Sequence, residues 1–235
     1  MPSAAAPPAA KPCEPPPPTT VPPAAPPDRA RLAAGLEAFL GDMVRERSEI
    51  VARPTPFLAR GTIWDVMHYG HSHPFYFHLG AIEGSPTVVL SSSSALVGFA
   101  RQAGLVLDDD AKRVAYVKTF LSLDPKILQL LESPQDIHFT VPRDIASMTV
   151  PAEDMEALRP IFLEEIQRRR QVEDRHAGSI KPMCLKGAFP FRGVIHAIKR
   201  QQTLVRLEVT LERSGEVAVR ELVLAEQVPV PAVYP

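Results

Sequence analysis

The chain of 235 residues carries 26 basic and 27 acidic residues, for a net charge of −1, and 45% of its residues are hydrophobic. This composition is typical of a water-soluble globular protein, and the balanced charge gives no general attraction to a phosphate backbone, so we expect no nucleic-acid partner. Its apolar runs are shorter than the roughly 18 residues of a membrane span, and residues 1–10 lack the basic and leucine-rich parts of a secretory signal, which favours a cytoplasmic location.

The first 27 residues form a Pro/Ala-rich segment that holds twelve of the 26 prolines. Proline fixes φ and removes a backbone donor, and alanine offers little apolar surface, so residues 1–27 are predicted to be a disordered, extended tail. Cys13 lies in this tail, and Cys184 lies far downstream among apolar residues. Two cysteines so placed do not make a disulfide framework, and we expect both to be free thiols.

Ordered structure is predicted to begin at Asp28, which can cap a helix. The helix is expected to run to about Val51 and to stop ahead of Pro54, because the residue before a proline disfavours the helical conformation. Its apolar residues recur at steps of three and four, as expected for one buried helical face: Leu32, Leu36, Phe39, Leu40 and Met43. Residues 54–73 show no clear pattern.

The next stretch predicts a β-hairpin followed by two helices. Residues 75–81 alternate and lead through a turn at 83–85 into the apolar run 87–90. The serines that follow supply N-caps for a short helix over 95–103, and a cluster of aspartates begins a second helix at about 108.

The central part of the chain predicts one strand and one charged helix. A short strand is expected at 137–141. The helix that follows is expected to be interrupted at Pro160, which suits the first position of a new helical run that ends near Arg175.

The C-terminal residues predict a three-stranded antiparallel meander. Residues 191–198 and 203–211 have strand patterns, and Ser214-Gly215 supplies a tight turn. In the third strand the apolar phase slips by one residue around Arg220 or Glu221, which indicates a β-bulge.

The predicted fold class is therefore α+β, with a C-terminal antiparallel β-meander packed on helices and an N-terminal helix and β-hairpin. Over residues 150–230 the order of a helix followed by a meander resembles that of cystatin-like and NTF2-like folds. We expect one globular domain over residues 28–235, with 28–148 and 149–235 as an alternative subdivision.

Histidines and aromatic residues are concentrated between residues 64 and 78, where four of the seven histidines lie within eleven residues. Such a stretch favours packed structural histidines, with a ligand pocket as the functional alternative. The candidate ligand-pocket residues are Trp64, His68, His71, His73, Tyr76 and His78.

An H-x-H pair on a strand can supply two ligands of a zinc site. Here the pair would be His71 and His73, with Asp65 as the first choice of third ligand. Other candidates for the third ligand are His68, His138 and His196. Since no HExxH motif accompanies the pair, a metal is not favoured, and no cofactor is indicated.

No pattern of a nucleophile elbow, phosphate loop or buried carboxylate pair is present in the sequence. We therefore expect a non-catalytic binding or accessory protein that takes a small-molecule ligand or a protein partner. The alternatives are a metal-dependent or histidine-based hydrolase centred on residues 65–78 and a structural or assembly protein that forms a homodimer through its sheet.

Overall fold

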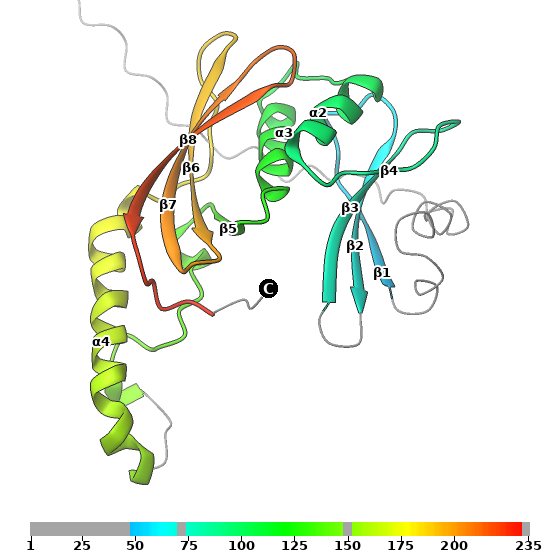
Figure 1. Ribbon diagram of the computed structural model, residues 1–235. Helices are drawn as coiled ribbons and strands as arrows, with labels where there is room; N and C mark the ends of the chain where they lie inside the picture. Colours follow the sequence, from blue (N-terminus) through cyan, green and yellow to red (C-terminus); the bar gives the residue numbers. More distant parts are fainter. Residues whose placement is uncertain (1–47, 70–73, 148–151, 232–235) are drawn as a thin grey trace, which may run out of the picture.

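The computed structural model describes residues 48–69, 74–147 and 152–231 (Figure 1). One antiparallel sheet, the N-terminal sheet, contains in spatial order β1 (Ser48–Arg53), β2 (Thr62–Tyr69), β3 (Pro74–Ala81) and β4 (Val88–Val89). The other, the C-terminal sheet, contains β5 (Ile127–Leu131), β6 (Phe191–Lys199), β7 (Thr203–Leu211) and β8 (Val217–Ala225). The helices are α2 (Ser93–Gln102), α3 (Asp110–Ser122) and α4 (Ala152–His176), with short 3-10 turns at Pro134–Asp136, Ile145–Ser147 and Ala177–Ser179. The predicted α+β class is confirmed, as is the C-terminal meander packed on helices.

The N-terminal sheet contains the predicted hairpin, but its first strand includes residues that were predicted to be helical. β3 pairs with the short strand β4 through Leu79 and Gly80, around the turn that was expected at 83–85. Residues 48–51, expected to end a helix, instead belong to β1, where Ile50 packs with the side chains of β2 and the whole strand pairs with β2. The rest of the predicted helix and the predicted tail lie outside the described residues.

Both short helices begin at the caps that the sequence predicts. The Ser92 hydroxyl accepts a hydrogen bond from the Ala95 amide, and the Asp109 carboxylate accepts one from the Lys112 amide. These side chains satisfy amide groups that a helix leaves without a partner in its first turn. Within the described residues, no helix is both long enough and apolar enough to cross a membrane.

The C-terminal sheet contains the predicted meander with two corrections. The prediction of a strand at 137–141 is wrong, because this segment is irregular. The strand in this part of the chain is β5, which lies earlier and pairs with β6. The predicted bulge is misplaced: Leu204 and Val205 pair with Ala225 and Val223, so the extra residue is Leu224. The alternation predicted for β7 is observed, with Leu207, Val209 and Leu211 buried.

α4 is one continuous helix that contains Pro160, so the predicted interruption at this proline is wrong. Proline removes one helical hydrogen bond, and an exposed position such as this one can tolerate that loss. Near its C-terminus α4 buries Val172 against Ile198 and Leu204 of the C-terminal sheet, in a cluster that also includes Val228.

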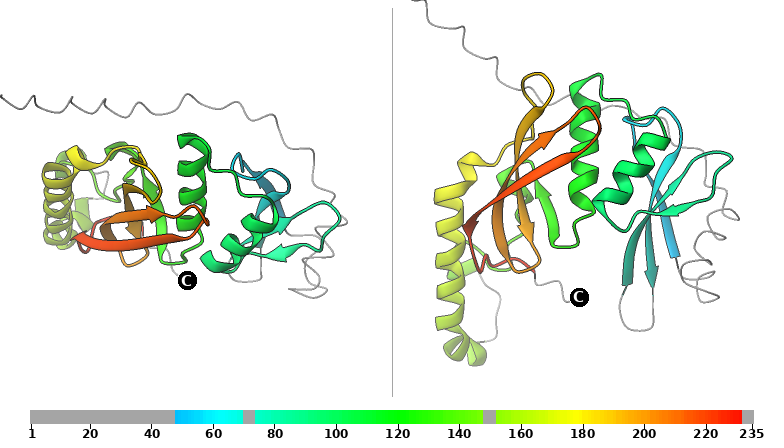
Figure 2. Two further views of the ribbon diagram at one scale, coloured as in Figure 1. Left: turned by 90° about the horizontal axis from the view of Figure 1, so that it is seen from above. Right: turned by 45° about the horizontal axis from the view of Figure 1, so that its top comes forward.

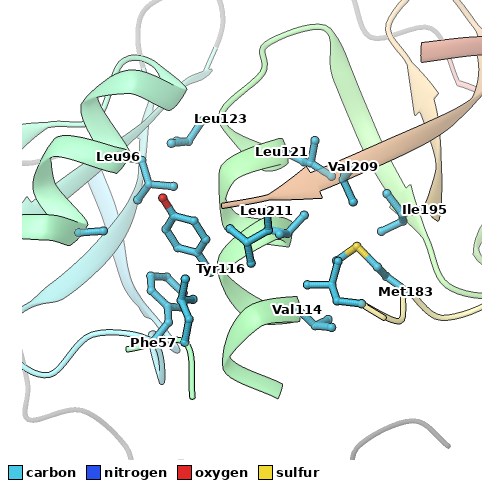
Figure 3. Close-up of a cluster of buried hydrophobic side chains, with 14 of the residues drawn as sticks. Phe57, Leu96, Val114, Tyr116, Leu121, Leu123, Met183, Ile195, Val209 and Leu211 are labelled. Atoms are coloured by element: carbon cyan, nitrogen blue, oxygen red, sulfur yellow. The ribbon is translucent and has the colours of Figure 1, made fainter. Parts of the chain in front are cut away.

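α3 lies between the two sheets, as Figure 1 and both views of Figure 2 show. Its Tyr116 is fully buried, and its ring packs edge-on against Phe57, with 5.3 Å between the ring centroids (Figure 3). The Tyr116 hydroxyl donates a 2.6 Å hydrogen bond to the carbonyl of Gly215 in the β7–β8 turn. The same apolar cluster contains residues of both sheets and both short helices, among them Ile63, Leu96, Val117, Leu121, Ile195, Leu207 and Leu211.

Tyr116→Phe tests this connection. The substitution keeps the ring but leaves the buried Gly215 carbonyl without its donor, so we expect a loss of about 1–3 kcal/mol in the free energy of unfolding, measured by urea denaturation. Tyr76→Phe is the control, because Tyr76 is 70% exposed, and it should change stability by less than about 0.5 kcal/mol. Equal effects of the two substitutions on the free energy of unfolding would contradict the role given to the Tyr116 hydroxyl.

Candidate functional site

The strand pairing divides the predicted histidine-rich site between the two faces of the N-terminal sheet. Asp65 pairs with His78 and Met67 pairs with Tyr76, so Asp65, His78 and Tyr76 share one face. Trp64 and His68 point to the opposite face, where both are buried. Trp64 packs with apolar residues of β1 and β3, and the His68 ring lies 3.0 Å from the Ser48 hydroxyl.

Asp65 is the centre of a polar network that joins three strands and α3. Its carboxylate lies 2.7 Å from His78 Nδ1 and accepts two hydrogen bonds from Arg53 Nε, at 3.0 and 3.1 Å. Arg53 also donates to the Ser122 hydroxyl at the end of α3, at 2.6 Å. Burial raises the pKa of Asp65, but the hydrogen bonds and positive charges of His78 and Arg53 outweigh this effect, so the pKa lies below its usual value near 3.8.

The structure does not assemble the predicted metal site from the residues it describes. His71 and His73 lie outside the described residues. His138 is exposed after β5, and His196 lies on β6 in the other sheet, so neither joins Asp65. Within 48–69, 74–147 and 152–231, no three His, Cys, Asp or Glu side chains are grouped as metal ligands.

A larger candidate site lies on the C-terminal sheet. One face of this sheet, the core face, packs on α3 through residues such as Ile195 and Leu207. On the other face, the open face, α4 covers only the end near Ile198 and Leu204. The remainder of the open face is the floor of a groove with a volume of about 1000 Å³.

Strand register defines the floor of the groove as two rows of side chains. The first row runs from Arg192 on β6 through Thr210 on β7 to Ala218 on β8. The second row consists of Val194, Glu208 and Arg220. Residues directly opposite one another in a sheet project from the same face, so each row presents its side chains to the groove.

Residues 179–186 form one wall of the groove and run along the free edge of β6. Lys186 and Arg192 exchange two backbone hydrogen bonds, of 2.8 and 3.2 Å, where β5 no longer pairs with β6. Gly193 permits this close approach, because a Cβ at that position would lie 2.8 Å from the carbonyl oxygen of Cys184. Cys184 is disulfide-bonded, so the expectation that it is a free thiol is wrong.

The charged residues that line the groove are one acid, Glu208, and four cations, Lys181, Lys186, Arg192 and Arg220. Glu208 lies 3.1 Å from an Arg206 nitrogen and 3.8 Å from an Arg220 nitrogen. His196 closes the inner end of the groove and is 4% exposed, with Nε2 at 3.4 Å from the Ser179 hydroxyl. Burial lowers the pKa of His196, and the charges of Arg206 and His176 lower it further, so this ring is neutral at pH 7.

Sequence reasoning did not identify this groove. Its residues come from the segment 179–186 and from three strands, and each side chain is ordinary in its local context. The available signal was the alternation along β6, which places Arg192, Val194 and His196 on one face. No protein-family model, curated protein or solved structure matches this chain.

Asp65→Asn tests the role of the polar network through its pH dependence. A carboxyl group whose pKa is lower in the folded state stabilises the fold above its usual pKa, and this contribution is lost as the pH falls below about 4. At pH 7 the substitution should cost about 1–2 kcal/mol, toward the low end for charged hydrogen bonds because Asp65 is 39% exposed.

The difference in unfolding free energy between wild type and Asp65→Asn should therefore shrink between pH 5 and pH 2.5. Asp174→Asn is the control, because Asp174 is 68% exposed and lies 3.6 Å from its nearest cation, Arg143. A wild-type advantage over Asp65→Asn that is unchanged at pH 2.5 would contradict the ionised network.

Proposed function

We propose that the protein is a non-catalytic binding or accessory protein and that the groove on the open face of the C-terminal sheet is its binding site. The observation that supports this proposal is the groove itself, whose volume of about 1000 Å³ is at the upper end of that of small-molecule sites. Its lining includes apolar residues such as Val194 and Ala218 and a small set of polar groups that can orient a ligand.

The polar network of the N-terminal sheet does not favour the hydrolase alternative. An Asp–His pair activates a nucleophile only when a hydroxyl or thiol lies within reach of the second imidazole nitrogen. The neighbouring Ser122 hydroxyl instead donates to the Thr119 carbonyl and accepts from Arg53. We interpret Asp65, His78 and Arg53 as a structural connection between the sheet and α3.

Blocking the groove tests the proposed site. Ala218→Trp places a large side chain over the first row of the floor, so we expect it to weaken the binding of Nile red, a neutral apolar dye, at least tenfold in a fluorescence titration. Val223→Trp is the matched control, because Val223 lies on the same strand and shares the core-facing side with Val205. Failure of the wild type to bind the dye, or equal binding by Ala218→Trp, would contradict the proposal.

A homodimer through β8 is the second candidate, and the exposure of this strand favours it. β8 pairs only with β7 among the described residues, and Val219, Leu222 and Val223 are between 42% and 49% exposed. An edge strand with exposed apolar side chains is a surface on which another strand can pair.

Size-exclusion chromatography with light scattering tests the dimer. The wild type should have the mass of two chains at about 50 μM, and a Leu222→Lys/Val223→Lys double variant should be monomeric, because charges on an edge strand oppose pairing. A monomeric wild type across micromolar concentrations would exclude this second candidate without affecting the groove.

The cytoplasmic location stays a prediction from the sequence. The disulfide at Cys184 argues against it, because disulfides persist mainly in oxidising compartments.

A further inference from the structure

Lys186 and Arg192 form an unusual pair at the edge of the groove. They are directly opposite one another in a hydrogen-bonded antiparallel bridge, which places their Cα atoms about 5.5 Å apart with both side chains on the same face. Like charges in such a position repel and destabilise the pairing. An arrangement of this kind is relieved when an anion lies between the two cations.

No acidic side chain among the described residues relieves this repulsion. Neither Lys186 nor Arg192 lies within ion-pair distance of a described carboxylate, and the same holds for Lys181 on the wall of the groove. Glu208, the acid of the floor, is already paired with Arg206 and Arg220. The groove therefore has an excess of positive charge in a chain whose net charge is −1.

The groove also offers apolar surface beside these cations. Lys186 extends the first row beyond Arg192, so two cations and the Thr210 hydroxyl lie side by side. Val194 follows Arg192 on the same face of β6, and Pro182 of the wall also lines the groove, whereas Ala218 lies across Thr210 on β8. The long aliphatic parts of the lysine and arginine side chains add to this surface while their charged ends reach the rim.

We propose that the ligand of the groove is an amphipathic anion, a molecule with an apolar body and a carboxylate or phosphate head. The head group binds between Lys186 and Arg192 and accepts a hydrogen bond from the Thr210 hydroxyl, and the apolar body lies along Val194 and Pro182. This inference rests on the proposed function, because it names the class of ligand for the same groove.

Isothermal titration with amphiphiles of one chain length tests the proposal on the full chain. The probes are dodecanoate, dodecyl phosphate, dodecyl maltoside and dodecyltrimethylammonium, each below its micelle concentration. We expect the two anions to bind at least tenfold more tightly than the neutral and cationic probes. Their affinity should fall as NaCl is raised from 50 to 500 mM, because salt screens exposed charges.

A Lys186→Gln/Arg192→Gln double variant should raise the Kd of dodecanoate at least tenfold and leave Nile red binding unchanged. Lys186→Arg, which keeps the charge, should retain dodecanoate binding. Lys126→Gln is the matched control, because Lys126 is exposed and lies outside the groove.

The outcomes separate this inference from the proposed function. Equal affinity for anionic and cationic probes, or an unchanged Kd in the double variant, would overturn the anion assignment. If Nile red still binds and Ala218→Trp still blocks it, the groove remains a binding site for another class of ligand. A protein that binds neither Nile red nor dodecanoate would overturn both proposals.

Discussion

The buried side chain of Tyr116 joins the two halves of the fold, within an apolar cluster to which both sheets contribute. It fixes the β7–β8 turn against α3, and the ring of the same side chain packs on Phe57, which precedes β2. Gly215 has a φ of +86°, and a Cβ there would lie 2.6 Å from Leu105 Cδ2 and 3.0 Å from the tyrosine oxygen. The direction of β8 is set by its pairing with β7, and the tyrosine ties the turn between these two strands to α3.

An element could be predicted from the sequence where its residue pattern is typical of only one kind of structure. β7 alternates between a buried and a half-exposed face, and the caps at Ser92 and Asp109 are local signals. β2 was missed although its burial alternates, because the partly exposed face carries Met67 and Tyr69 as well as Asp65, so apolar and aromatic residues lie on both faces and the sequence does not alternate between apolar and polar residues. β5 has only five residues, and a short apolar run does not distinguish a strand from a helix.

The candidate sites could not be predicted in full, because they depend on the register in which the strands pair, and the sequence alone does not define this register. Asp65 and His78 were both named from the sequence, but only the pairing of β2 with β3 places them together and separates them from His68. The groove depends on contacts between segments distant along the chain, such as Arg192 with Thr210. A pattern read along one strand identifies a face, whereas the neighbours on that face are set by the tertiary fold.

The position of Lys186 also limits how the C-terminal sheet can be extended. Lys186 already pairs with Arg192 at the edge of β6. Within the described part of the chain, the free edge of the sheet next to the groove is therefore that of β8, where an incoming strand could pair. That is also the side of the groove across from the wall formed by residues 179–186. A strand added there would continue the sheet, so self-association would widen the floor of the groove on the side away from that wall.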